Sequence, residues 1–179
     1  YYNFYLVNFV ILMLTLFLCR HAKSSWAEPG LNDKDRPLNE RGKNDAPMMG
    51  RMLQNREENP DLIISSPAVR AFKTAKLISG ELGYSQRDIV VDTNLYMPGV
   101  NDFISVLKKC SKKYKTIMLF SHNYGITDFA NYISGSDIEN IPTCGIVKIR
   151  FDFGNWESIK KEKGKLEYFI YPKMFKNGI

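Results

Sequence analysis

Both histidines of this chain stand directly after short, largely apolar segments, and this repeated context constrains the fold more than any other feature. Residues 14–19 lead into Arg20 and His21, and residues 116–120 lead through a serine into His122. Such segments are typical of strands that are buried on both faces of a parallel sheet. Parallel strands end at one edge of the sheet, where open α/β folds bind ligands. We therefore expect the two imidazoles to lie together at that edge.

Strand-like and helical segments alternate along the rest of the chain. The expected strands cover residues 14–19, 61–67, 88–91, 116–120, 145–153 and 166–171, the last two as an antiparallel pair turning near Lys163 and Gly164. The expected helices begin at the N-cap Asn39, at Pro67, at Asn101 and near Thr127, and the third of them is expected to end at Lys113. Pro47 is expected to distort the first of them. The alternation predicts an α/β fold, a three-layer α/β/α sandwich with a mostly parallel central sheet.

The amino-terminal 19 residues carry no charge, which approaches the length of a membrane span. Residues 14–19 are needed as the first strand, however, and the thirteen residues before them are too few to cross a bilayer as a helix. They also lack the basic start and the cleavage site of a secretory signal. We interpret residues 1–12 as a non-essential extension and residues 13–179 as a single domain, with a membrane anchor as the alternative for residues 1–12.

Composition excludes several classes of function. A chain of 179 residues, 44% of them hydrophobic, forms one compact core. The net charge of +6 suits an anionic ligand, but the two lysine clusters lack interleaved aromatic residues, so nucleic-acid binding is not expected. Three distant cysteines argue against a disulfide framework and a zinc site, and favour a reducing, cytoplasmic compartment. No carboxylate cluster is spaced for a metal, and no glycine-rich nucleotide motif is present.

Polar side chains follow three of the expected strands. Arg20 and His21 follow the first, Ser66 leads from the second to Arg70, and His122 follows the fourth. Two guanidinium groups and two imidazoles at one sheet edge would bind a tetrahedral anion such as phosphate or sulfate. A histidine among arginines can also act as a nucleophile on phosphorus without a metal. Taken singly, Arg70 could instead pair with a surface carboxylate, and His122 could be a core histidine.

Several ordered segments resemble a known family. They are residues 20–26 (RHAKSSW), 35–43 (DRPLNERGK), 65–71 (SSPAVRA), 94–96 (NLY), 121–123 (SHN), 141–145 (IPTCG) and 171–173 (YPK). Together they resemble the histidine phosphatase superfamily, in the form of the SixA-like phosphohistidine phosphatases, over residues 13–173. The resemblance implies the histidine phosphatase (phosphoglycerate mutase-like) fold.

The resemblance also implies roles for individual residues. His21 would be the nucleophile that is transiently phosphorylated, and Arg20, Arg70 and His122 would hold the phosphoryl group. Ser24 and Asn123 are further candidates for phosphate binding. No cofactor and no metal are expected.

The chain departs from the wider superfamily at three places. Ala22 replaces the glycine of the signature, and Ala27 stands where many members carry a pocket asparagine. Residues 94–98 contain no Glu or Asp to serve as a general acid, and Asp102 is expected to cap a helix instead. A site without a general acid favours a good leaving group, such as a phosphorylated imidazole, over an alkyl alcohol. The short segment between Arg70 and residue 88 leaves no room for a large cap insertion.

These observations predict a metal-independent phosphatase that dephosphorylates phosphohistidine on a protein. One candidate partner is a histidine phosphotransfer protein of a signalling relay; neither nucleic acid nor a membrane is an expected partner. The alternatives are a small-molecule phosphomonoesterase of the same superfamily and a non-catalytic phosphate-binding module. A mutase is less favoured, since it needs a closed pocket that shields the intermediate from water.

Overall fold

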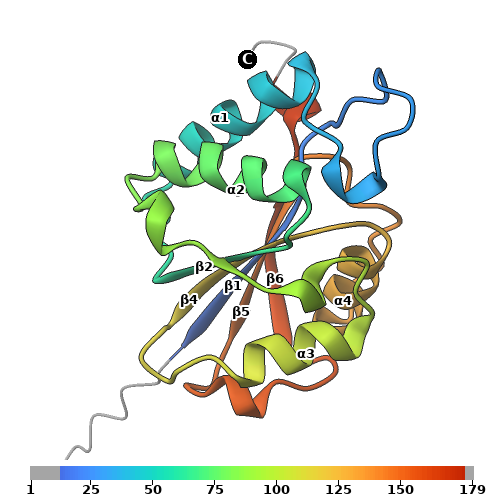
Figure 1. Cartoon of the computed structure of the whole chain (residues 1–179). Coiled ribbons are helices and arrows are strands. Elements are labelled where there is room, and N and C mark those ends of the chain that lie inside the picture. The colour runs from blue at the N-terminus through green and yellow to red at the C-terminus, as the bar shows by residue number, and fades with distance from the viewer. Residues whose placement is uncertain (1–12, 176–179) are drawn as a thin grey trace, which may run out of the picture.

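A six-stranded sheet forms the centre of the structure, a computed structural model that describes residues 13–175 (Figure 1). Its strands are β1 (Leu14–Arg20), β2 (Leu62–Ser65), β3 (Val90–Val91), β4 (Thr116–Ser121), β5 (Ile146–Phe151) and β6 (Gly164–Ile170), in the spatial order β3-β2-β4-β1-β5-β6. The first four are parallel, whereas β5 pairs antiparallel with both β1 and β6. The predicted mostly parallel sheet with an antiparallel closing pair is confirmed.

Two layers of helices cover the sheet, as Figure 1 shows. The helices are α1 (Glu40–Gln54), α2 (Val69–Glu81), α3 (Val100–Lys108) and α4 (Gly125–Ser134). Helices α1 and α2 lie on one face, and α3 and α4 lie on the other. Between β2 and β3 the chain forms only α2 and a short 3-10 turn, Gln86–Asp88. The three-layer α/β/α sandwich without a large cap insertion is therefore confirmed.

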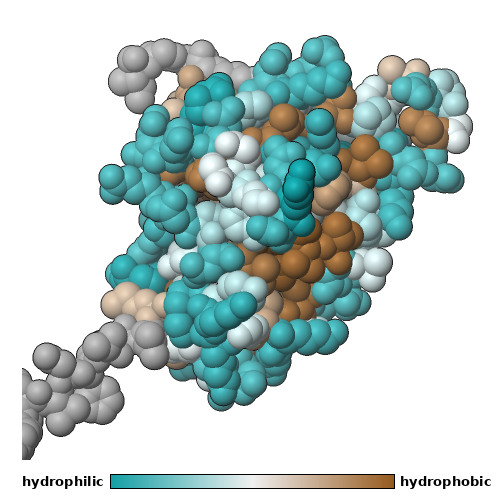
Figure 2. All heavy atoms as spheres, turned by 60° about the vertical axis from the view of Figure 1, so that its left-hand side comes forward, coloured by the Kyte–Doolittle hydropathy of each residue, from teal (hydrophilic) through white to brown (hydrophobic). Residues whose placement is uncertain are grey.

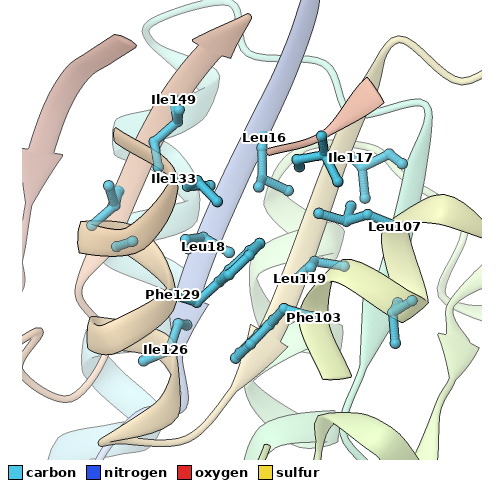
Figure 3. Packing of buried hydrophobic residues seen from close by; sticks show 14 of the residues in the cluster. Leu16, Leu18, Phe103, Leu107, Ile117, Leu119, Ile126, Phe129, Ile133 and Ile149 are labelled. Carbon is cyan, nitrogen blue, oxygen red and sulfur yellow. The ribbon is translucent and has the colours of Figure 1, made fainter. Parts of the chain in front are cut away.

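The sheet divides the core into two halves, because its central strands bury side chains on both faces. Figure 3 shows the half that packs against α3 and α4. There the rings of Phe103 and Phe129 stack with centroids 4.6 Å apart, beneath Leu18 of β1 and Leu119 of β4. The other half lies under α1 and α2 and contains Phe17 of β1. Burial on both faces holds β1 and β4 in register and so fixes where each strand ends.

Local signals set most helix boundaries, and the end of α3 differs from expectation. The Asn39 side chain accepts a hydrogen bond from the Gly42 amide, so α1 begins where predicted. However, α1 runs on through Pro47 to Gln54, because burial of its inner face outweighs the missing hydrogen bond. Helix α3 ends at Lys108 rather than at residue 113, since the lysine-rich segment beyond it is largely exposed and has little apolar surface to bury.

Hydrophilic residues predominate on the face turned forward in Figure 2, and the hydrophobic residues gather in a few patches between them. Within residues 13–175 no helix has the length and apolarity needed to span a bilayer. The predicted extension at residues 1–12 lies outside the described residues, so its interpretation stays a prediction. The cytoplasmic location also stays a prediction.

Candidate active site

The pairing of β1 with β4 brings the two histidines together. Arg20 lies opposite Ser121 in the parallel register, and the backbone amide of His21 donates to the carbonyl of Ser121 at 3.1 Å. The strands therefore end at the same level, and the next residue of each is a histidine. The ring centroids of His21 and His122 are 5.0 Å apart. Both side chains are buried, which makes this sheet edge the centre of the candidate site.

Two hydrogen bonds define the tautomer of His21. Its Nδ1 lies 2.8 Å from the carbonyl oxygen of Ala22, which can only accept, so Nδ1 carries the proton. On the other side of the ring, Nε–H of Arg70 donates to Nε2 at 3.3 Å. Both contacts require the same neutral form, with a lone pair on Nε2. The unprotonated nitrogen, whose lone pair can attack an electrophile, is therefore the one beside the guanidinium group.

Arg70 is held on three sides. Its Nη2 donates to a carboxylate oxygen of Asp33 at 2.7 Å, and its Nη1 donates to the backbone carbonyl of the same residue. One turn further along α2, the Thr74 hydroxyl donates to the carbonyl of Arg70 at 2.6 Å and accepts from the amide of Ala22 at 2.9 Å. Thr74 therefore ties the start of α2 to the residue after His21, which fixes the guanidinium against the imidazole.

Asp33 connects three side chains of the site. Besides Arg70, it binds Arg36 through a 2.9 Å ion pair, and the Tyr96 hydroxyl donates to it at 3.0 Å. Burial favours the neutral carboxyl, but the hydrogen bonds from Arg70, Arg36 and Tyr96 outweigh it and lower the pKa of Asp33 to about 2. Asp33 is therefore a carboxylate at neutral pH and has no proton to donate. The Tyr96 ring in turn meets the His122 ring edge-on, with centroids 5.4 Å apart.

His122 and Arg20 each carry a buried polar atom for which residues 13–175 provide no hydrogen-bond partner. His122 is hydrogen bonded through Nε2 to the Ser66 hydroxyl at 2.7 Å, which leaves Nδ1 unpartnered. Arg20 donates through Nη1 to the carbonyl of Ile141 at 2.6 Å, which leaves Nε unpartnered. Buried polar groups without partners are costly, and an anion that accepted from them would remove that cost.

The electrostatics of the site keep both imidazoles neutral. Burial is the main cause that lowers the pKa of His21 to about 4, and it prevails over the bond to Ala22; the positive charges of Arg70, Arg20 and Arg36 act in the same direction. Burial likewise lowers the pKa of His122 to about 3, aided by His21, Arg70 and Arg20 and opposed by Asp33. A neutral imidazole beside several guanidinium groups combines a nucleophile with a binding site for an anion.

Comparison with known proteins agrees with this geometry. The family model described as the histidine phosphatase superfamily (branch 1) matches residues 16–96. An uncharacterised chloroplastic protein of Arabidopsis thaliana is 31% identical, over 88% of this chain and 77% of its own length. The chain belongs to the histidine phosphatase superfamily. It is a phosphatase-type hydrolase with the phosphoglycerate mutase-like fold, as the motifs predicted.

Solved structures place this histidine phosphatase beside the SixA proteins. The candidate phosphohistidine phosphatase SixA of Agrobacterium tumefaciens is 27% identical and superposes with a TM-score of 0.75, over 89% of this chain and 98% of its own. A protein histidine phosphatase SixA in complex with tungstate has a TM-score of 0.79 at 19% identity, over 91% of this chain and 100% of its own. The first likeness supports the SixA-like assignment, and the second shows a shared fold.

The other two predicted site residues of this histidine phosphatase lie at the edge of the site, with their side chains bound to protein groups. The Ser24 hydroxyl accepts from Nη2 of Arg36 at 2.8 Å. The Asn123 amide donates to the side chain of Asn140 at 2.6 Å, and its oxygen accepts from the Thr127 hydroxyl at 2.6 Å. The structure therefore brings Arg20, His21, Arg70 and His122 together, whereas Ser24 and Asn123 support the loops around them.

Sequence reasoning missed Asp33, Arg36 and Tyr96 as members of the site. The loop that carries Asp33 and Arg36 connects β1 to α1 and folds back over the start of α2. The available signal is Arg36, which lies inside the family-like segment 35–43, together with an acid three residues before it. Within residues 13–175 no group of three or more His, Cys, Asp or Glu side chains is arranged to hold a metal ion.

Proposed function

We propose that this histidine phosphatase hydrolyses phosphohistidine on a protein, with His21 as the nucleophile. The observation that carries the proposal is the lone pair on Nε2 of His21, which faces the Arg70 guanidinium in a buried site shared with His122. Arg20 and Arg70 would hold the equatorial oxygens of the phosphoryl group. His122 would contribute a further hydrogen bond through its unpartnered Nδ1.

The reaction proceeds in two displacements. In the first, Nε2 of His21 bonds to phosphorus as the bond from phosphorus to the substrate imidazole breaks, and the departing nitrogen takes its proton from solvent. In the second, a water oxygen bonds to phosphorus as the bond to Nε2 breaks. The water gives up a proton to solvent, inorganic phosphate leaves, and His21 returns to its neutral form. In the first step, the proton on Nδ1 lets the bond to Ala22 strengthen as positive charge develops on the imidazole.

The carboxylates near the site favour a phosphorylated nitrogen as the substrate. Asp33 is ionised, since its pKa is about 2, and so has no proton for an alcohol leaving group. Asp102 accepts a hydrogen bond from the Gly99 amide at 2.8 Å and caps α3, as predicted. An imidazole leaves phosphorus without strong acid assistance, whereas an alkoxide does not. The likeness to the Agrobacterium tumefaciens SixA protein, a candidate phosphohistidine phosphatase, points the same way.

The test compares turnover of phosphoramidate, a phosphohistidine peptide and an alkyl phosphate by the wild type and by His21→Ala. We expect kcat/KM for both phosphorus–nitrogen substrates to exceed that for the alkyl ester, and His21→Ala to abolish all turnover. Rapid quench with labelled phosphohistidine peptide should trap an acid-labile, base-stable phosphoenzyme in the wild type only. Equal rates for wild type and His21→Ala would remove His21 as the nucleophile. A strong preference for the alkyl phosphate would instead favour a phosphomonoesterase.

A further inference from the structure

The most exposed large hydrophobic side chains of residues 13–175 all belong to the loops that form the site. They are Trp26, Met97 and Tyr124, which are 76%, 68% and 77% exposed. Every other exposed large hydrophobic residue in this part of the chain is less than half exposed. Trp26 follows His21 by five residues, Met97 directly follows Tyr96, and Tyr124 follows His122 by two. We call these three residues the apolar rim.

The backbone that carries the apolar rim is held by specific contacts. The Arg36 guanidinium lies over the Trp26 ring, 3.1 Å from the centroid, and the same group bonds to Asp33 and Ser24. Met97 has a φ of +50°, which places an apolar side chain in solvent at a backbone conformation that costs about 1 kcal/mol for a residue other than glycine. Contact with water does not offset this conformational cost for an apolar side chain.

The segments of Met97 and Tyr124 also pack against each other. A Cβ added to Gly125, the residue after Tyr124, would lie 1.9 Å from the carbonyl oxygen of Pro98, the residue after Met97. The two exposed side chains therefore flank one tight backbone contact at the mouth of the site. On the Trp26 side, a cavity of about 310 Å³ is lined by Trp26, Leu31 and Arg36 among others, large enough to receive a side chain.

We propose that the apolar rim is the surface on which a phosphorylated protein docks, with apolar side chains around its phosphohistidine. This inference rests on the proposed function. A phosphoryl dianion complements Arg20 and Arg70 at the centre, so it fixes the point about which the partner's surface must lie. Trp, Tyr and Met are the residue types enriched at protein interfaces. A small phosphorylated molecule without an apolar substituent, such as phosphoramidate, would leave all three side chains in water.

The experiment measures, for each variant, the ratio of kcat/KM on a phosphohistidine protein to kcat/KM on phosphoramidate. The protein substrate is a purified histidine phosphotransfer domain that has been phosphorylated chemically. We expect the ratio to fall tenfold or more in Met97→Ala and in Tyr124→Ala, and further in the double variant. Met13→Ala is the matched control: it removes a 45% exposed methionine at the opposite end of β1, and should leave the ratio unchanged.

The outcomes separate this inference from the proposed function. A ratio unchanged by the rim variants, or an equal loss on both substrates, would overturn the docking surface while leaving phosphohistidine hydrolysis intact. The docking surface would also be overturned if the wild type cleaved free phosphohistidine as efficiently as the phosphorylated protein substrate. Failure of the wild type on every phosphohistidine substrate, with turnover of alkyl phosphates retained, would instead refute the proposed function.

Discussion

The imidazole of His21 lies between a carbonyl that accepts from one nitrogen and a guanidinium that donates to the other. The backbone of Ala22 therefore supplies the orienting acceptor that a carboxylate supplies in many nucleophile–base pairs. Burial keeps the imidazole neutral in the ground state despite this bond, so the ring gains charge only as the bond to phosphorus forms. The carboxylate of Asp33 is directed at Arg70 instead.

Arg70→Ala should lower kcat/KM for phosphoramidate by a factor that corresponds to about 2–4 kcal/mol, because it removes charge and paired donors from the developing oxyanion. Arg70→Lys should recover only part of the loss, since an ammonium group lacks the planar fork. Arg51→Ala is the matched control: Arg51 pairs with Glu81 on the surface at 3.1 Å, and its loss should leave kcat/KM unchanged. Similar rates for Arg70→Ala and Arg51→Ala would contradict the proposed role of Arg70.

Asp33→Asn should lower kcat/KM by the same factor for phosphoramidate and for an alkyl phosphate. The substitution loosens Arg70, which both substrates need, and its neighbour Arg36, but it removes no proton donor, because the pKa of Asp33 is about 2. The measurement is the ratio of the two kcat/KM values before and after the substitution. A loss confined to the alkyl phosphate would identify Asp33 as a general acid and would contradict the ionised state derived from its partners.

At the scale of the elements, glycine permits the contact between α4 and the Met97 segment. Gly125→Ala should reduce the free energy of unfolding by about 1–3 kcal/mol, because its Cβ would meet the Pro98 carbonyl at 1.9 Å and the backbone must shift. Gly80→Ala is the control: its Cβ would meet only the flexible end of Gln86 at 3.4 Å, so it should raise stability by up to about 1 kcal/mol. Urea denaturation of both variants measures the difference, and equal stabilities would show that the α4 contact relaxes freely.

The elements were largely predictable from the sequence, and the loops between them were not. Apolar runs identify β1 and β4 because both strands are buried on both faces, and the Asn39 cap identifies the start of α1. The meeting of His21 with His122 followed from these strands alone. The position of Asp33 did not, because its bond to Arg70 joins residues 37 positions apart through a loop without a periodic pattern. Its partners depend on the folded course of that loop.

At the scale of the whole molecule, the cationic groups lie together at the carboxyl ends of the parallel strands, next to the hydrophobic core. Arg20 ends the central strand β1, while Arg70 opens α2 on one face and His122 precedes α4 on the other. All three layers therefore contribute to the site. Folding buries two imidazoles that would be charged in mild acid if exposed, and this burial costs free energy as the pH falls. Stability should consequently depend on pH in a window set by these groups.

We expect the free energy of unfolding to fall as the pH is lowered from 7 to 5.5. The pKa values of His21 and His122 are about 4 and 3 in the folded chain, and that of an unfolded histidine is about 6.5. In this window the unfolded chain binds protons that the folded chain does not, so stability rises with pH and falls with acid. Each fully bound proton contributes about 1.4 kcal/mol per pH unit.

The chain has only two histidines, and ordinary carboxyl groups titrate below this window, so the slope can be assigned to them. Urea denaturation at pH 7, 6.5, 6 and 5.5 measures it, and the double variant His21→Asn with His122→Asn should remove it. The imidazole nitrogen resonances of the folded wild type should meanwhile stay at neutral positions throughout. Titration of either ring near pH 6.5, or a slope that persists in the double variant, would contradict the burial argument.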